Sequence, residues 1–262
     1  MCYDISFTVE LRTLSEYFPG LVFDSQLEID FDATVHIMGH GYGEHPIIFR
    51  SREDGLPHCR AMEWGVIPFY IREEKAFLRQ RASMLNARSE RILDDPKSYW
   101  YKIRNRRCLV PVNGFYEHRG IKGWKKKVPY FIGLKEQPLF FLPGLYSVAE
   151  LPDLSTGELI RRWTYTIITR GANEVMCNIH NDGDNRGRMP LMLPFEMAQE
   201  WIAEELPDAR YRELLNYEMP APAMDYRPVF TIRGGKSRPD DQPKNMYWEW
   251  EKLPELGEGN PD

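Results

Sequence analysis

The stretch RCLVPVNGFYEH, from Arg107 to His118, begins the part of the chain in which strand-like runs dominate. It holds two runs of strand-forming residues, Arg107–Val112 and Gly114–His118, joined by an asparagine and a glycine. β-branched and aromatic residues favour strands, and Asn-Gly favours a turn. Runs of the same kind follow, which predicts a β-rich core. They are Val128–Leu134, Leu139–Val148 and Arg162–Thr169.

Helices are predicted on both sides of these strands, from amphipathic spacing or from a proline in the first turn. Their expected ranges are Val9–Tyr17, Glu73–Ser83, Pro96–Asn105, Pro194–Glu204 and Pro207–Tyr217. Strands mixed with helices, without strict βαβ alternation, are typical of an α+β fold with a mainly antiparallel, barrel-like sheet. We therefore expect a single α+β domain with helices flanking its sheet.

The C-terminal part of the chain differs from the rest in composition. A last strand is expected around Arg227–Ile232, before a loop rich in Gly, Lys, Pro and Asp. We place the domain at residues 1–235 and an acidic, aromatic extension at residues 236–262. Within this extension, Met246–Trp250 is expected to pack on the domain and Glu255–Asp262 to fray.

Bulk features exclude several classes of protein. No apolar run approaches the roughly 18–20 residues of a membrane span, and the N-terminus lacks the pattern of a secretory signal. The four cysteines are scattered without a CxxC pair, which argues against a zinc site and a disulfide framework. These features favour a reducing, cytoplasmic location, at the nucleoid if the source is a bacterium, and predict no membrane partner. The cysteines are Cys2, Cys59, Cys108 and Cys177.

Charge is unevenly distributed along the chain. The net charge is −5, and residues 240–262 alone contribute −5, because seven acidic side chains there outnumber two lysines. Residues 79–127 carry fourteen Lys/Arg and four Asp/Glu, a net of +10. A local basic region attracts phosphate whatever the global sum is, although a solvated charged face is the commoner cause of such a run.

Cys2 follows the initiator methionine directly. If Met1 is removed, Cys2 carries a free amine and a thiol on adjacent carbons. An α-amino group has a pKa of about 7.7–8.0, so part of it is a neutral nucleophile at pH 7. The amine can form an imine with an aldehyde, and the thiol can then close a thiazolidine ring. By position alone an ordinary buried cysteine is the commoner case, so other residues must support the reactive interpretation.

Five short motifs occur in order along the chain. They are Met1-Cys2, Trp64-Gly65-Val66-Ile67-Pro68, Asn86-Ala87-Arg88-Ser89-Glu90, Gly114-Phe115-Tyr116-Glu117 and His180 followed by Arg188-Met189-Pro190. One such motif is weak, but the ordered set is specific. From Cys2 to about Val229 the chain thus resembles the SRAP family, named for SOS-response-associated peptidases. The resemblance implies the SRAP fold, self-removal of Met1 and a covalent crosslink to abasic sites in single-stranded DNA.

The resemblance also implies roles for individual residues. Cys2 would form the thiazolidine with the sugar aldehyde, and Glu117 would move protons as a general acid and base. His180 would assist opening of the sugar ring, and the Asn86 amide would recognise the abasic position without adding charge. Without the family pattern, Glu117 would be interpreted as an exposed charge at a strand end, His180 as a solvated histidine and Asn86 as a cap or turn residue. No cofactor and no metal are implied.

A second set of residues matches the DNA-contacting positions of the family. Arginine binds phosphate oxygens bidentately, and aromatic rings stack on bases. Trp64 is expected to be partly core, and Phe69 or Tyr70 to be the exposed wedge. The full set is Arg88, Arg188, Trp64, Phe69, Tyr70, Pro46 and Thr169.

The chain departs from the family pattern in three places. In one of them, Phe69-Tyr70 replaces a tryptophan pair that is found in some relatives. Family members commonly continue Met-Cys-Gly-Arg, with the arginine on phosphate, whereas Tyr3-Asp4 follows Cys2 here. Asp4 would repel DNA if it pointed toward the strand. The segment 181–187 also lengthens the loop before Arg188, so that Arg186 competes with it for a phosphate role.

Three functions stay open on the sequence. The leading one is covalent capture of abasic sites, which leaves open both a lasting adduct and strand cleavage by β-elimination. The second is a thiol peptidase that uses Cys2 and His180 on other proteins. The third is a non-covalent module for single-stranded DNA.

Overall fold

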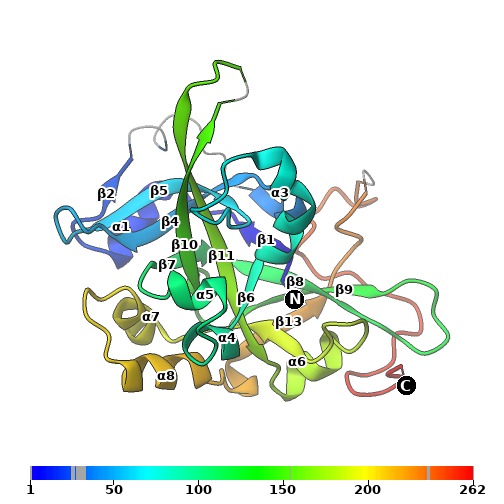
Figure 1. Cartoon of the computed structure of the whole chain (residues 1–262). Helices are drawn as coiled ribbons and strands as arrows, with labels where there is room; N and C mark the ends of the chain where they lie inside the picture. Colours follow the sequence, from blue (N-terminus) through cyan, green and yellow to red (C-terminus); the bar gives the residue numbers. More distant parts are fainter. Residues whose placement is uncertain (1, 25–26, 28–33, 154, 235–236, 262) are drawn as a thin grey trace.

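Five strands close into a barrel at the centre of the molecule (Figure 1). The computed structural model describes residues 2–24, 27, 34–153, 155–234 and 237–261. The barrel strands are β4 (Glu44–Arg50), β5 (Pro57–Trp64), β7 (Arg107–Val112), β10 (Phe140–Pro152) and β11 (Leu159–Gly171). Antiparallel pairs join them in the order β11, β10, β7, β4 and β5, and a parallel pair between β5 and β11 closes the barrel.

Three short strands attach to the barrel. β6 (Asn86–Arg88) runs parallel to β11, β12 (Arg188–Pro190) runs antiparallel to it, and β2 (Val22–Phe23) runs parallel to β5. β11 is therefore the strand on which the Asn-Ala-Arg and Arg-Met-Pro motifs meet: Thr169 faces Arg88 in one ladder and Pro190 in the other.

A second, antiparallel sheet lies beside the barrel. Its order is β13 (Met224–Pro228), β9 (Val128–Leu134), β8 (Gly114–Arg119), β1 (Asp4–Phe7) and β3 (Thr34–Met38). The chain crosses from β7 in the barrel to β8 in this sheet at Asn113-Gly114. A Cβ on Gly114 would lie 2.6 Å from the Ile132 carbonyl oxygen, so only glycine permits this crossing. The stretch 107–118 thus connects the two sheets.

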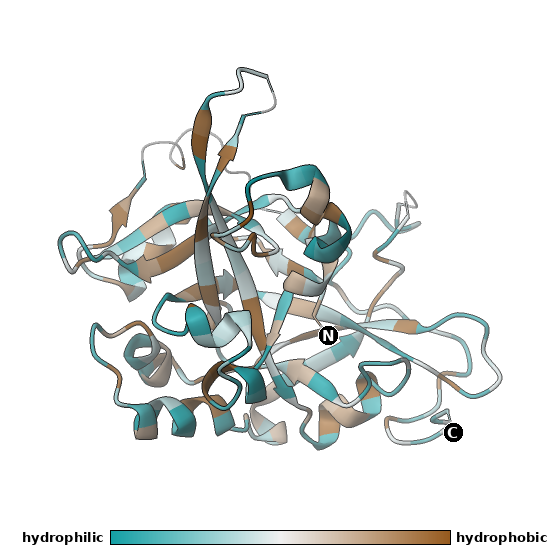
Figure 2. Cartoon of the chain, viewed as in Figure 1, coloured by the Kyte–Doolittle hydropathy of each residue, from teal (hydrophilic) through white to brown (hydrophobic). Residues whose placement is uncertain are grey.

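Helices pack on the outside of both sheets. The longer ones among the described residues present polar faces to solvent and apolar faces to the strands (Figure 2). None of these described helices is long and apolar enough to cross a membrane. They are α1 (Leu14–Tyr17), α3 (Glu74–Arg81), α4 (Glu90–Leu93), α5 (Tyr99–Lys102), α6 (Glu174–Ile179), α7 (Phe195–Trp201) and α8 (Asp208–Asn216), with 3₁₀ turns at Leu11–Thr13, Gly39–Gly41, Ala82–Met84 and Ala221–Ala223.

The predicted α+β class and mainly antiparallel core are confirmed. Two predicted strands, Arg107–Val112 and Val128–Leu134, have the observed bounds. The helix predicted at Pro96–Asn105 is wrong in its start: it begins after Ser98, whose hydroxyl accepts a hydrogen bond from the Trp100 amide. The last strand ends at Pro228 rather than Ile232. The strands from β1 to β6, and β12, were not predicted.

The C-terminal residues are docked on the domain. Val229 and Tyr247 form a β-bridge, and the Trp250 indole donates to the Val229 carbonyl at 3.0 Å, so the predicted packing of Met246–Trp250 is confirmed. The predicted fraying of the last residues is wrong for 255–261. Arg119, fully buried on β8, donates to the carbonyls of Glu255 at 2.7 Å and Glu258 at 2.6 Å. These carbonyls satisfy a buried guanidinium and tie the segment down.

Candidate active site

Cys2 lies at the entrance of β1, between the two sheets. The pairing of Asp4 with Tyr116 in β8 brings the N-terminal end of β1 beside Glu117. The Cys2 side chain is fully buried in the apolar core that fills the barrel. Its carbonyl accepts a hydrogen bond of 2.9 Å from the Asn86 amide. The structure therefore unites the first and third motifs, which are 84 residues apart.

Asn86 is a buried polar residue whose two ends differ. Its amide nitrogen holds the Cys2 carbonyl, while its Oδ1 is buried and accepts no hydrogen bond from any residue that the structure describes. β6 is fixed to β11 by parallel pairing, so the amide cannot easily turn away. Asn86 thus combines a backbone-positioning donor with an acceptor presented to the site.

Glu117 is a nearly buried carboxyl, 5% exposed, at the centre of the site. Burial, reinforced by the negative charge of Asp4, raises the pKa of Glu117 to about 7. At neutral pH both its protonated and its ionised forms are therefore populated. Burial, followed by the charges of Glu117 and Asp4, raises the pKa of the Cys2 thiol well above its ordinary value. The thiol is thus protonated in this arrangement.

His180 ends helix α6 and faces Glu117. Its Nδ1 lies 2.8 Å from the Arg188 carbonyl oxygen, and a carbonyl only accepts, so Nδ1 donates and carries the proton. Burial lowers the pKa of His180 to about 4, so the ring is neutral. Its Nε2, which then carries a lone pair, is 3.9 Å from Glu117 Oε2. A weak acid and a neutral base thus lie side by side.

A hollow of about 340 Å³ opens onto Glu117 and His180. Its walls come from the N-terminal strand, β8, the loop after α6 and the segment after β13. The lining residues are Tyr3, Asp4, Glu117, His118, Lys127, His180, Asp182, Gly183, Asp184, Asn185 and Arg233. Cys2 and Asn86 lie deeper than this lining.

Asp4 is turned inward rather than toward the solvent. It is 2% exposed and bonds Arg233 through both carboxylate oxygens and His36 Nε2 at 2.7 Å. Burial alone would raise the pKa of Asp4, but the bonds from His36 and Arg233 hold it below its usual value. The expected repulsion of DNA by a free Asp4 charge is thus removed. Sequence reasoning missed Arg233, because its distant loop carries no motif.

The lengthened loop 181–187 forms one wall of the hollow. Asn181 exchanges hydrogen bonds with the backbone of Gly120, at 2.8 and 3.0 Å, and Lys127 Nζ lies 3.0 Å from Asp182. Arg186 is exposed on this loop. The loop therefore adds carboxylates as well as an arginine to the rim.

The two predicted phosphate-binding arginines differ in their surroundings. Arg88 is exposed, with one bond of 3.2 Å to the Asn185 side chain. Arg188 forms a bidentate pair with Glu90, at 2.6 and 3.1 Å, and donates to the Thr169 carbonyl at 2.7 Å. Arg88 is thus available to a phosphate, whereas Arg188 would first have to leave Glu90.

Three residues predicted to contact DNA are buried. Trp64 is fully enclosed, stacks on Tyr165 and donates from its indole to the Leu85 carbonyl at 2.9 Å. A base cannot stack on an enclosed ring, so this contact is corrected to a core role. Pro46 is buried on β4 opposite Ala61, and Thr169 is fully buried on β11. Neither is among the residues that line the hollow.

Phe69 and Tyr70 lie on the surface, as expected of a wedge. They are 42% and 53% exposed, and their rings meet edge to face at 5.8 Å. Tyr99 supports both rings at 5.6 and 5.7 Å, and its hydroxyl accepts a 3.0 Å bond from the Phe69 amide. We call Phe69, Tyr70 and Tyr99 the aromatic ledge.

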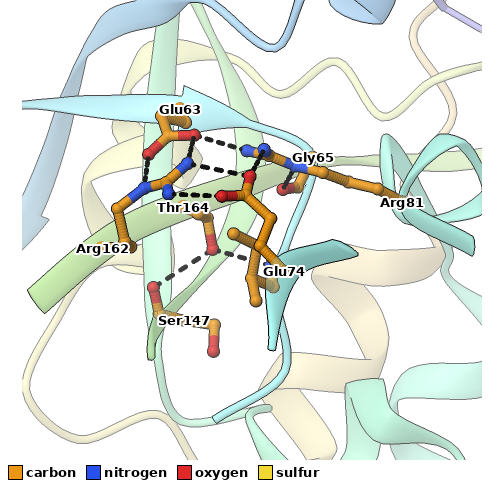
Figure 3. Close-up of polar contacts among 8 residues, drawn as sticks. Glu63, Gly65, Glu74, Arg81, Ser147, Arg162 and Thr164 are labelled. Atoms are coloured by element: carbon orange, nitrogen blue, oxygen red, sulfur yellow. Dashed lines mark hydrogen bonds and ion pairs between the residues drawn. The ribbon is translucent and has the colours of Figure 1, made fainter. Parts of the chain in front are cut away.

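A buried charge network fixes the loop that carries this ledge (Figure 3). Arg81 bonds Glu63 at 2.6 Å and Glu74 at 3.2 Å, and its Nε donates to the Gly65 carbonyl. Arg162 from β11 bonds the same two carboxylates. The network thus ties α3 to β5 and β11 at both ends of segment 65–74. We call these four side chains the arginine–glutamate network.

No group of three or more His, Cys, Asp or Glu side chains within the described ranges could hold a metal ion. All four cysteines are free: Cys2, Cys59 and Cys108 are buried, and Cys177 is exposed. The groups beside Cys2 that are suited to moving protons are therefore the Glu117 carboxyl and the His180 imidazole.

Comparisons with known proteins identify the family of the chain. The profile of the family described as SOS response associated peptidase (SRAP) matches residues 1–232. The abasic site processing protein YoqW of Bacillus subtilis is 34% identical over 154 residues, which cover 59% of this chain and 61% of that protein. The abasic site processing protein HMCES of Gallus gallus is 29% identical over 190 residues, 65% of this chain and 52% of that protein. The chain thus spans about three fifths or less of these relatives.

A solved structure shares the fold over almost the whole chain. A protein from Bacteroides thetaiotaomicron superposes with a TM-score of 0.78 at 28% identity, covering 95% of this chain and all of that one. A protein from Bordetella bronchiseptica superposes with a TM-score of 0.66 at 19% identity, covering 88% of this chain. The second likeness concerns the fold alone.

Proposed function

Because the chain belongs to the SOS response associated peptidase (SRAP) family, we propose that it processes abasic sites in single-stranded DNA by forming a covalent thiazolidine through Cys2. The relatives YoqW and HMCES are named abasic site processing proteins. The observation that carries the proposal is the position of residue 2. Its carbonyl is held by Asn86, beside a carboxyl with a raised pKa.

The chemistry begins with removal of Met1, which frees the α-amine of Cys2. That amine adds to the C1′ aldehyde of the ring-opened sugar to give a carbinolamine. Loss of one water then gives an imine. The Cys2 thiol adds to the imine carbon: a carbon–sulfur bond forms, and the thiol proton ends on the nitrogen. The product is a five-membered ring, one water lighter than its two components.

Glu117 and His180 supply the proton transfers that these steps require. The protonated form of Glu117 can donate to the departing hydroxyl of the carbinolamine, and its ionised form can accept a proton from the attacking amine. A pKa of about 7 keeps both forms present. His180 can take a proton at Nε2, because its Nδ1–H is committed to the Arg188 carbonyl. It is therefore suited to accept the proton of the sugar hydroxyl during ring opening.

The surface around the hollow supports binding of a single strand. The aromatic ledge offers exposed rings, and stacking tolerates any base at roughly 1–3 kcal/mol each. Arg88 offers a guanidinium group for a phosphate near the hollow, whereas Arg233, like Arg188, would first have to leave its carboxylate partner.

Mass spectrometry tests this proposal. The purified protein is expected to lack Met1 and to form, with an abasic oligonucleotide, an adduct one water lighter than the sum of its parts. Cys2→Ala is expected to abolish the adduct. Cys177→Ala, which removes the exposed cysteine, serves as the matched control and should react like the wild type. A full-yield adduct from Cys2→Ala would disprove the assignment of the nucleophile.

A thiol peptidase acting on other proteins fits the site less well. Such an enzyme needs a thiolate, whereas burial raises the pKa of Cys2, and His180 faces Glu117. Turnover of unrelated peptides without crosslinking would reverse this ranking. Binding that ignores the abasic site would instead favour a non-covalent module.

A further inference from the structure

An arginine-rich hollow opens at the end of the barrel remote from Cys2. At this end β4 finishes, β5 begins and β7 begins, and the rim faces solvent in two adjoining depressions of about 150 and 310 Å³. Both depressions are lined by Ser51, Arg52 and Tyr146, so they form one continuous trough. None of its residues belongs to the Cys2 site.

Four arginines of this trough have no acidic partner. Arg50, Arg52, Arg106 and Arg107 form no ion pair with any carboxylate in the parts of the chain that the structure describes. Arg50 and Arg107 donate to backbone carbonyls, Arg50 to Ile202 at 3.1 Å and Arg107 to Trp201 at 2.7 Å. Arg52 makes one bond, of 3.3 Å, to the Asn105 carbonyl.

Arg106 is the least satisfied of the four. Its Nη1 is buried without a hydrogen-bond partner among the described residues, and its guanidinium lies 6.0 Å from the Tyr146 ring. Elsewhere on the surface most arginines pair with carboxylates, as Arg210 does with Glu200 and Glu213. Unpaired arginines gathered in one trough create a positive potential that attracts an anion.

Acidic side chains at the trough reduce this potential without cancelling it. Glu53 and Glu204 also line the depressions. Two further arginines stand at the rim, each with a carboxylate: Arg60 with Asp24 at 2.7 Å and Arg161 with Glu150 at 3.6 Å. The four arginines without a carboxylate thus outnumber the two carboxylates of the lining.

The aromatic floor of the trough favours phosphate over a base. Trp163 stacks on Tyr146 at 5.8 Å with one face, and the Arg60 guanidinium lies 4.2 Å over the Trp163 ring. Phe49 is 5% exposed. No broad ring face is therefore left for a base to stack on, while the arginines remain in the lining.

We propose that this trough binds the sugar-phosphate backbone of a nucleic-acid strand, at a second site separate from the one that contains Cys2. Spread along two adjoining depressions, the arginines suit successive phosphates of an extended chain better than one isolated anion. The inference rests on the proposed function, since that function brings a DNA strand to the protein.

The geometry sets the length of strand that can use both sites. β5 runs from His58 at the trough to Trp64, whose indole bonds the residue next to Asn86. Six residues of strand span about 20 Å. For a strand with stacked bases, spaced at about 3.4 Å per nucleotide as in duplex DNA, this straight-line distance equals about six nucleotides. A stacked strand whose abasic position lies at Cys2 thus reaches the trough only when its flank is longer than this.

The test compares two abasic oligonucleotides, one with about three nucleotides on each side and one with about fifteen. The variant is Arg52→Gln combined with Arg106→Gln, because these two side chains make few bonds within the protein. Arg12→Gln combined with Lys135→Gln, both exposed elsewhere, makes the same change in net charge and serves as the control. Crosslinking rates are measured at limiting protein, and affinity for a long strand without an abasic site by fluorescence anisotropy.

The trough variant is expected to bind the long strand roughly tenfold more weakly at low salt. The slope of log affinity against log salt should fall by about 1.4, at about 0.7 for each phosphate that the variant no longer neutralises. Crosslinking of the short oligonucleotide should be unchanged, as should every property of the control. Equal affinity and slope in wild type and variant would overturn the proposal.

Two further outcomes are separable. A free mononucleotide that binds at the trough but does not compete with the long strand would identify a small-molecule phosphate site and overturn the strand proposal. Absence of any covalent product from either oligonucleotide would contradict the proposed function alone, because anisotropy still reports on the trough.

Discussion

Glu63 is a partly buried glutamate and Glu117 a buried one, and they differ in their charged partners. Glu63 lies in the arginine–glutamate network, where Arg81 and Arg162 bond both of its oxygens. Burial alone would raise the pKa of Glu63, but the bonds from Arg162 and Arg81 hold it below its usual value. At Glu117 the effect of burial dominates, and the pKa rises to about 7.

This difference separates a carboxylate that is held in its ionised form from a carboxyl that can exchange a proton near neutral pH. A carboxylate fixed by two guanidinium groups stays ionised at neutral pH and holds the segment that carries the aromatic ledge in place. A buried carboxyl that faces a neutral imidazole can gain and lose a proton near pH 7. We therefore expect a change at Glu117 to lower mainly the activity, and a change in the arginine–glutamate network to lower mainly the stability.

The largest expected effect comes from neutralising the reactive carboxyl. Glu117→Gln keeps the shape of the side chain but can neither donate nor accept the proton of the carbinolamine step. The rate of crosslinking should fall by about 10²–10⁴-fold, measured by gel shift of an abasic oligonucleotide under single-turnover conditions. Glu16→Gln, an exposed change on α1, is the control and should react at the wild-type rate. An unchanged rate in Glu117→Gln would remove this residue from the chemistry.

Breaking the structural network should cost stability instead. Arg81→Met removes a buried guanidinium and leaves the partly buried Glu63 and Glu74 with only one, so the free energy of unfolding should fall by about 3–5 kcal/mol, measured by urea denaturation. Arg161→Met, an exposed neighbour of Arg162, should stay within about 0.5 kcal/mol of the wild type. Equal stability of the two variants would show that the network contributes little to the fold.

The smallest effect is a pH dependence that Glu117 alone confers. Its folded pKa of about 7 exceeds its ordinary value of 4.5, so the folded state binds more protons in this interval. Its contribution to stability is thus fully present below pH 4.5 and is lost as the pH rises through 7. Glu117→Gln does not show this loss. Between pH 4.5 and 7 its free energy of unfolding should therefore rise, relative to that of the wild type, by up to about 3 kcal/mol.

Urea denaturation of both proteins across this range measures the difference. The buried histidines titrate in both proteins, so their contribution cancels in the comparison. A difference that stays constant with pH would contradict the raised pKa of Glu117.

Local sequence patterns located the fold class and much of the site. Arg107–Val112 and Val128–Leu134 were predicted to the residue because both are continuous apolar runs. Cys2, Asn86, Glu117 and His180 were identified from ordered motifs, and the structure brings the last three around the first. β4 and β5 were missed because their polar residues, among them Arg60 and Glu63, pair only in the folded barrel.

Local motifs identified the chemical groups of the candidate site: the thiol of Cys2, a carboxyl, an imidazole and an amide. The folded structure set which of these groups and their neighbours are buried, ionised or exposed. It placed Arg233 on Asp4, Glu90 on Arg188 and Trp64 in the core. The physical reason is that pKa values and exposure depend on burial and on charged neighbours from distant segments. Cys2 and Asn86 meet across 84 residues, and no local pattern encodes that contact.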